Sequence, residues 1–218
     1  MATARSRFSD LMNQKLVQQH SPITIIGAGG IGSPVAETLA GIGFNLRIFD
    51  HDTVGAENIG SQRYGFNEIG RKKVGVLKTR LETAYRVKIE AIEEKYLGQI
   101  PLSGIIVCGV DSLKTRAMIW EHVKYNAGIP LYLDGRVGGE RFKLFCLNPC
   151  DPTAIEKYET HLDLRASRPV TRCTSKFAPQ AGIALNWGIS CAVKELITGG
   201  KVPFQILGEN LHFQRVDL

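Results

Sequence analysis

The chain has 218 residues and a net charge of +6, from 27 Lys and Arg against 21 Asp and Glu. No apolar run is long enough to cross a membrane, and the first twenty residues lack the apolar centre of a secretory signal, so we expect a cytoplasmic protein without membrane contact. The positive charge favours an anionic ligand, but it is too dispersed along the chain to indicate nucleic-acid binding.

The first half of the chain alternates short apolar runs with segments of helical periodicity, as in proteins with parallel sheets. In chain order, the expected elements are a helical arm over 1–20, a strand over 23–26, a helix over 33–40, a strand over 46–49, a helix over 67–86 interrupted near Gly70, and strands over 87–92 and 104–108.

The second half predicts a helix over 112–126, strands over 131–133 and 141–147, a long crossover loop over 151–176, a helix over 179–198, and a terminal hairpin of 204–207 with 211–216. Strands that alternate with helices form a mostly parallel sheet covered on both faces. We therefore expect one α/β, Rossmann-like domain over 1–218, with antiparallel strands near its C-terminal end.

A glycine-rich turn, Gly27-Ala28-Gly29-Gly30-Ile31-Gly32, joins the first strand to its helix. Gly27 permits a tight turn, Gly29 and Gly30 let backbone amides approach a phosphate, and Gly32 lets the helix pack closely on the strand. Asp50 ends the next strand, where a carboxylate can accept hydrogen bonds from ribose hydroxyls. These features predict a nucleotide site without separating ATP from NAD. A turn that serves packing alone is the alternative.

Further motifs follow in a fixed order. They are His51-Asp52-Thr53-Val54-Gly55-Ala56-Glu57-Asn58-Ile59-Gly60-Ser61-Gln62-Arg63, then Ile69-Gly70-Arg71-Lys72-Lys73-Val74, then Cys108-Gly109-Val110-Asp111, and Arg116. From about Ile23 to Leu147 the chain resembles the ThiF/MoeB family, the adenylyltransferases related to ubiquitin-activating enzymes. The resemblance implies ATP-dependent adenylation, with Mg²⁺, of the C-terminal carboxylate of a ubiquitin-like protein or a peptide.

The resemblance also assigns roles to single residues. It implies that Asp50 holds the ribose and that Asn58 binds the nucleotide or its phosphates. Lys73 is expected to neutralise phosphate charge, and Asp111 to lie near Mg²⁺ and the α-phosphate. Asp52 belongs to the same nucleotide-binding set. Structural alternatives stay open. Asp52 and Asp111 can cap the elements that follow them. Lys73 with Lys72 can form a solvated helix face.

One position departs from the family pattern. Ser61 stands where the family usually has an arginine that contacts the phosphates, and Arg63 can replace it if the loop bulges. The resemblance also implies a homodimer, in which Arg5 or Arg7 of one N-terminal arm reaches the partner's site.

The five cysteines have separate interpretations. Cys173, within Cys173-Thr174-Ser175-Lys176, resembles the thioester cysteine of eukaryotic ubiquitin-activating enzymes, and a structural thiol is the alternative. Zinc is not expected, because the chain lacks the two Cys-x-x-Cys pairs that the family uses. Cys108 and Cys191 are expected to be buried.

Two other readings stay open. In Asp134-Gly135-Arg136-Val137-Gly138-Gly139, Arg136 either meets a peptide carboxylate or lies on a hairpin turn. For the whole chain, an NAD-dependent oxidoreductase or a nucleotide-binding partner subunit without turnover is the alternative. No histidine has a recognisable setting for hydride-transfer chemistry.

Overall fold

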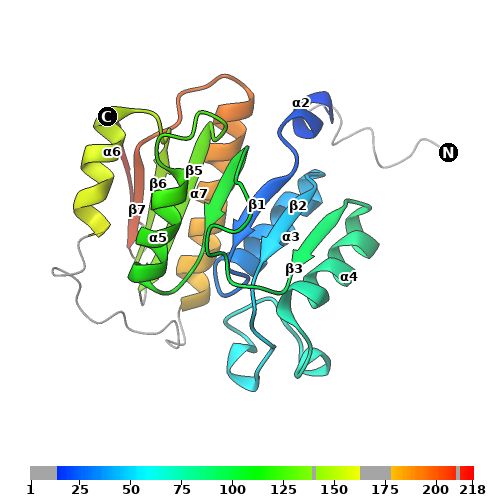
Figure 1. Cartoon of the computed structure of the whole chain (residues 1–218). Coiled ribbons are helices and arrows are strands. Elements are labelled where there is room, and N and C mark those ends of the chain that lie inside the picture. The colour runs from blue at the N-terminus through cyan, green and yellow to red at the C-terminus, as the bar shows by residue number, and fades with distance from the viewer. Residues whose placement is uncertain (1–13, 139–140, 163–177, 210–211) are drawn as a thin grey trace.

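The computed structural model describes residues 14–138, 141–162, 178–209 and 212–218. Its centre is an eight-stranded sheet in the order β3-β2-β1-β4-β5-β6-β7-β8 (Figure 1). The parallel strands are β3 (Ile89–Ile92), β2 (Leu46–Phe49), β1 (Ile23–Ile26), β4 (Ile105–Cys108) and β5 (Leu131–Gly138). The antiparallel strands are β6 (Arg141–Leu147), β7 (Gln205–Glu209) and β8 (His212–Val216). The predicted sheet is confirmed.

Helices cover both faces of the sheet, as predicted (Figure 1). On one face lie α3 (Gly32–Ile42), α4 (Lys73–Tyr85) and α7 (Ala178–Ile197); on the other lie α5 (Leu113–Val123) and α6 (Pro152–Glu159). The short helix α2 (Gln14–Gln19) precedes β1. None of the helices within the described ranges is both long and apolar enough to cross a membrane.

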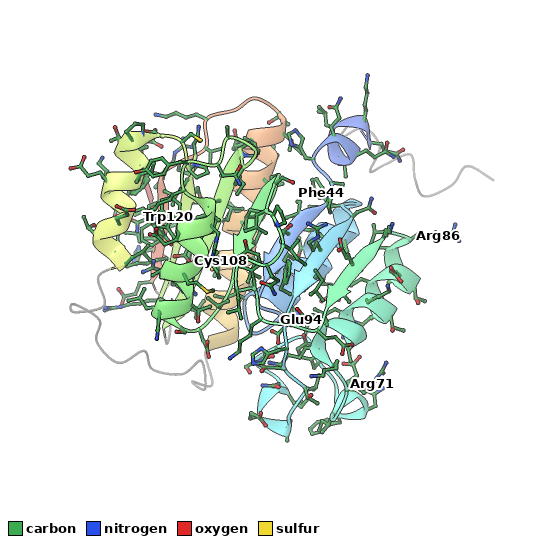
Figure 2. All side chains as sticks on the ribbon, viewed as in Figure 1. Phe44, Arg71, Arg86, Glu94, Cys108 and Trp120 are labelled. Atoms are coloured by element: carbon green, nitrogen blue, oxygen red, sulfur yellow. The ribbon has the colours of Figure 1, made fainter. Side chains whose placement is uncertain are left out.

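The two faces bury two apolar clusters because the β strands present side chains to alternate sides. Ile25, Leu77 and Leu185 pack in the cluster under α3, α4 and α7. Trp120 of α5 lies on the opposite face, as labelled in Figure 2. It packs against Tyr132 and Tyr158, with ring centroids 5.5 and 4.7 Å away. Burial of these side chains stabilises the sheet that positions the candidate site.

Three predicted elements need correction. Strand β5 extends to Gly138, so the predicted end at Leu133 is wrong. Helix α4 begins only at Lys73, because a short 3₁₀ turn over Phe66–Glu68 and the positive φ of Gly70, 86°, precede it. Strand β7 continues to Glu209, so the predicted end of this hairpin strand at residue 207 is wrong.

The predicted loop over 151–176 is wrong in its first part, where α6 and the 3₁₀ helix η3 (Thr160–Leu162) form. The Asp151 side chain accepts hydrogen bonds from the backbone amides of Thr153 and Ala154, and Pro152 occupies the first helical turn. Both features favour a helix start. The rest of that loop, and most of the predicted arm over 1–20, lie outside the described residues.

Candidate functional site

The candidate site lies where the chain changes direction across the sheet. From β1 the chain moves to β2 and β3 on one side, and later to β4 and β5 on the other. The loops after β1 and β4 therefore diverge at the carboxyl ends of the strands, which is where α/β sheets bind ligands. The Gly27 amide donates to the Phe49 carbonyl at 2.8 Å, and the Gly109 amide donates to the Ile26 carbonyl at 2.9 Å. These bonds hold the three strand ends together.

The glycines of the turn divide into two kinds. Gly27 has a φ of 95°, and an ideal Cβ on Gly32 would lie 1.8 Å from the Gly27 carbonyl oxygen, so both positions need glycine for the fold. A Cβ on Gly29 would come no closer than 4.0 Å to a neighbouring atom, and one on Gly30 no closer than 3.4 Å. A side chain at either position would thus make only ordinary contacts, and the backbone of both glycines is partly exposed, as a phosphate-binding turn requires.

Asp50 ties the glycine turn to the end of β2. One carboxylate oxygen accepts from the Ala28 amide at 2.7 Å and the other from the Asp52 amide at 2.8 Å. The residue is 9% exposed. Because each carboxylate oxygen has a second lone pair, Asp50 can still accept a hydrogen bond from a hydroxyl.

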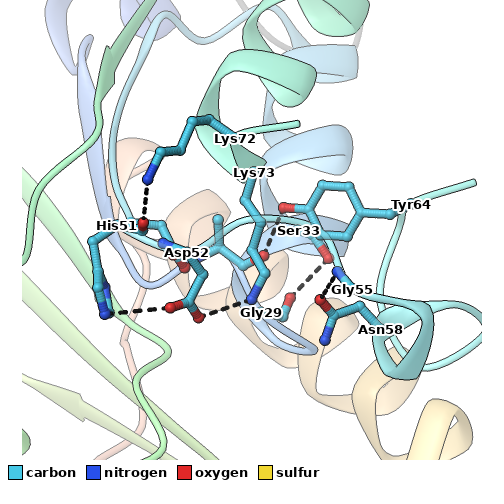
Figure 3. Close-up of polar contacts among 11 residues, drawn as sticks. Gly29, Ser33, His51, Asp52, Gly55, Asn58, Tyr64, Lys72 and Lys73 are labelled. Atoms are coloured by element: carbon cyan, nitrogen blue, oxygen red, sulfur yellow. Dashed lines mark hydrogen bonds and ion pairs between the residues drawn. The ribbon is translucent and has the colours of Figure 1, made fainter. Parts of the chain in front are cut away.

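Lys73 and Asp52 form an ion pair beside the turn (Figure 3). Lys73 is only 4% exposed, and its Nζ lies 3.0 Å from Asp52 Oδ2. Burial alone would raise the pKa of Asp52, but the Lys73 ammonium outweighs it and holds that pKa below its usual value. The solvated-face interpretation is therefore wrong for Lys73. It holds for the exposed Lys72, whose Nζ donates to the His51 carbonyl at 2.8 Å.

Asn58 has a local structural contact. Its side-chain oxygen accepts from the Gly55 amide at 2.9 Å and closes the short 3₁₀ helix Ala56–Asn58 (Figure 3). The residue is buried, so this turn is held firmly next to the site.

Sequence reasoning missed the contacts that fasten the following segment to the glycine turn. Ser33 Oγ donates to the Gly29 carbonyl at 2.7 Å and accepts from the Arg63 amide at 3.0 Å. The Tyr64 hydroxyl donates to the Ala28 carbonyl at 2.8 Å, and burial, with the charge of Asp50, raises its pKa. Gln62 lies against Gly29, and its side-chain oxygen is buried without a hydrogen-bond partner among the described residues. This oxygen without a partner, next to Gly29, makes Gln62 a candidate ligand contact.

The Arg63 side chain does not join this group. Its Nε lies 3.6 Å from Glu37 Oε2, and 53% of its side chain is exposed. Arg63 lines a shallow cavity of about 540 Å³ between α3 and α4, together with Pro34 and Tyr85. The loop thus directs Arg63 toward α3 rather than toward Lys73.

Asp111 follows β4 as an exposed carboxylate. Within the described part of the chain it makes no hydrogen bond or ion pair. Asp111 is not the N-cap of α5. The next residue, Ser112, has that role, because its Oγ accepts from the Thr115 amide at 3.3 Å. A free carboxylate suits a hard cation such as Mg²⁺.

Another acidic group lies nearby, where ligand atoms of Asp50, His51 and Asp52 fall within 4.8 Å of one another. Lys73 already occupies an oxygen of Asp52, and both oxygens of Asp50 accept backbone amides. Asp111 differs from both aspartates because its carboxylate has no partner among the described residues.

The described cysteines differ in exposure. Cys108 and Cys146 are buried, Cys191 is partly buried and Cys150 is exposed. Burial raises the pKa of the Cys146 and Cys191 thiols, which makes them poor nucleophiles. Cys173 lies outside the described residues, as do Arg5 and Arg7.

Comparisons with known proteins found a matching family model and similar sequences. A model of the ThiF family matches residues 3–140. The Nedd8-activating enzyme E1 catalytic subunit of Drosophila melanogaster is 32% identical over 117 residues, which are 49% of this chain and 25% of that protein. The Schizosaccharomyces pombe counterpart is 30% identical over 175 residues, 73% of this chain and 38% of that protein. The chain thus spans a quarter to two-fifths of the length of these relatives.

Solved structures share the fold. Escherichia coli MccB with ATP has a TM-score of 0.68 and 17% identity, with 97% of this chain and 71% of that chain covered. PaaA has a TM-score of 0.69 and 20% identity, with coverages of 96% and 69%. At these identities the likeness concerns the fold alone.

Proposed function

Because the chain belongs to the ThiF family, we propose that it activates the C-terminal carboxylate of a ubiquitin-like protein or a peptide by adenylation with ATP. The observation that supports this most is a buried Lys73 next to a glycine turn whose backbone is partly exposed at Gly29 and Gly30. Names of relatives point the same way: one is a NEDD8-activating enzyme, and MccB has been solved with AMPCPP and MccA.

In the proposed reaction, a carboxylate oxygen of the substrate attacks the α-phosphorus of ATP. A bond forms between this carboxylate oxygen and the α-phosphorus, which gives an acyl adenylate. The bond between the α-phosphorus and the bridging oxygen of pyrophosphate breaks, and pyrophosphate leaves with that electron pair. The amides of the glycine turn, the N-terminus of α3 and Lys73 bind the negative charge of the phosphates. Asp50 binds the ribose, and Asn58 binds the nucleotide or its phosphates. Asp52 holds Lys73 in place.

Mg²⁺ would be held by Asp111, and when bound it would offset phosphate charge. Asp111 suits this ion because it is an exposed carboxylate to which no other described side chain is bonded. In this proposal Arg63 contacts the phosphates in place of the arginine that the family usually has where this chain has Ser61. For this contact the Arg63 guanidinium must leave Glu37.

A partner subunit without turnover is the second candidate. The Arg63–Glu37 pair favours it, because this pair leaves the phosphates without the arginine that the family usually provides. Such a subunit would bind ATP but would not exchange pyrophosphate with it. ATP–pyrophosphate exchange, measured with small proteins that end in Gly-Gly, separates the two candidates.

We expect ATP with Mg²⁺ to raise the melting temperature, and NAD to leave it unchanged. At a hundred times the dissociation constant, binding adds about 2.7 kcal/mol, which for this size is a shift of about 5 °C or more. Differential scanning fluorimetry with each nucleotide measures it. A shift with NAD alone would favour the oxidoreductase alternative over adenylation.

We also propose that the protein is a cytoplasmic homodimer, since ATP is its substrate and the family resemblance implies that an N-terminal arm crosses to the partner's site. Light scattering at micromolar concentration is expected to give twice the 24.0 kDa chain mass. A mass of one chain throughout that range would contradict the dimer, and with it any role of Arg5 or Arg7 in trans.

A further inference from the structure

A buried charged cluster lies next to the Asp111 loop. Asp134 of β5 is fully buried, and Arg116 of α5 is only 5% exposed. The two side chains form an ion pair between Arg116 NH1 and Asp134 Oδ1. Asp134 is the register partner of Cys108, the last residue of β4. The pair therefore lies at the point where β4 ends and the loop to Asp111 begins.

The Arg116 guanidinium holds two oxygen acceptors at once. NH1 pairs with Asp134 and lies 3.9 Å from Cys108 Sγ, while NH2 donates to the carbonyl of Val110. Val110 immediately precedes Asp111. A planar guanidinium can satisfy both acceptors in fixed directions, whereas a lysine ammonium has a single nitrogen on a flexible stem.

Asp134 is itself fixed from other elements. Its Oδ2 accepts from the Tyr158 hydroxyl of α6 and from Arg136 Nε, both at 2.8 Å. Arg136 also donates to the His161 carbonyl at 3.0 Å and stacks over the Phe145 ring at 4.9 Å. Arg136 therefore meets an internal carboxylate within β5, which neither open reading of it anticipated. A buried carboxylate held from α5, β5 and α6 leaves Arg116 little freedom to move.

We propose that Arg116, locked by Asp134, is a positioning residue that fixes the Asp111 loop for cation binding. The inference rests on the proposed function, in which Asp111 holds Mg²⁺ beside ATP. Groups that orient a metal ligand commonly change metal affinity about 10- to 100-fold when they are altered. Here the orienting contact acts through the backbone, from Arg116 to the Val110 carbonyl.

The test is the Mg²⁺ concentration that produces half of the metal-dependent rise in melting temperature at a fixed ATP concentration. Arg116→Lys keeps the charge opposite Asp134 but loses the fork, so this concentration should rise roughly tenfold or more. Arg47→Lys is the matched control, because Arg47 pairs with Glu90 at 2.8 Å on β2 and β3, away from the Asp111 loop. It should leave the concentration unchanged.

A second variant keeps the test decisive if Arg116→Lys does not fold. Tyr158→Phe removes one charge-assisted hydrogen bond to Asp134 and leaves the Arg116 ion pair in place. A smaller rise in the half-point Mg²⁺ concentration, roughly two- to tenfold, is expected for it.

An unchanged Mg²⁺ requirement in both Arg116→Lys and Tyr158→Phe, with only the melting temperature without nucleotide lowered, overturns the inference and leaves the pair a purely structural one. A wild-type protein stabilised by ATP to the same extent with and without Mg²⁺ overturns the metal assignment of Asp111 as well. If the wild-type protein responds to Mg²⁺ and the variants respond in the same way, only the role of Arg116 is contradicted, and the proposed function stands.

Discussion

Lys73→Ala is expected to slow ATP–pyrophosphate exchange by roughly a hundredfold or more, as loss of one preorganised charge-stabilising group usually does. The ammonium is buried, so its charge acts through a medium of lower effective dielectric than water. Its position is fixed, because Asp52 holds it at 3.0 Å. A cation that is already oriented needs no rearrangement when charge develops on the phosphates.

The adjacent lysine provides the matched control. Lys72 is exposed, and its Nζ only donates to the His51 carbonyl, so Lys72→Ala should keep nearly all of the exchange activity. An equal loss in both variants would mean that general positive charge, rather than the placement of Lys73, supports the reaction. Arg63→Ala should have a smaller effect than Lys73→Ala if Arg63 stays paired with Glu37.

Asp111→Ala should abolish exchange and leave the fold intact. The side chain is exposed and uninvolved in described contacts, and such surface substitutions usually change stability by less than about 0.5 kcal/mol. Circular dichroism and a denaturation curve verify the fold, and the radioactive pyrophosphate incorporated into ATP gives the rate. Full exchange in both Asp111→Ala and Lys73→Ala would move the site away from this loop.

The same assay separates adenylation from acyl transfer. We propose Cys173 as the acceptor of the activated acyl group, and Cys173→Ala should keep exchange, since exchange needs only the first step. A covalent thioester adduct with the substrate protein, which an added thiol cleaves by acyl exchange, should disappear in this variant. Because Cys150 is exposed, Cys150→Ser is the parallel control. An adduct that depends on Cys150 instead would contradict the assignment of Cys173.

The sequence predicted the parts of the site that depend on local order. A strand, a glycine turn and a helix in succession place Gly29 at a helix start, and a strand-end carboxylate places Asp50 beside it. The burial of Lys73 was left open, because a lysine pair at a helix start has the same pattern whether it faces water or Asp52. What decides is the tertiary contact of Lys73 with Asp52, which comes from the segment after β2 and which periodicity does not specify.

Long-range polar contacts were not predictable in the same way. Asp134 is held by Arg116 and Tyr158, which come from separate elements, and Tyr158 lies in a stretch expected to be irregular. The helix there depends on the Asp151 cap and on apolar contacts of Tyr158, whereas composition alone reads the segment as polar. The pairing of Arg63 with Glu37 is also a tertiary contact, set by the path of the loop and not by residue spacing.

Gly32→Ala is expected to lower the free energy of unfolding by about 3 kcal/mol or more, at the upper end of what overpacking costs. The added Cβ would lie 1.8 Å from the Gly27 carbonyl oxygen and 2.9 Å from its carbonyl carbon. Both are backbone atoms, which cannot rotate aside as a flexible side chain can. Relief requires α3 to move off β1, and that movement would separate the buried contacts beneath the helix.

Gly29→Ala is the matched comparison, because its Cβ would meet no neighbouring atom closer than 4.0 Å. Stability should change little, while ATP should bind at least about tenfold more weakly, a loss of about 1.4 kcal/mol, since the methyl group enters the space open to the ligand. Urea denaturation measures the first quantity, and the dependence of the melting temperature on ATP concentration measures the second. Wild-type stability in Gly32→Ala would show that the turn can relax, whereas unchanged ATP binding in Gly29→Ala would place the phosphates elsewhere. The two substitutions thus separate the glycine that the fold requires from the glycine that the ligand requires.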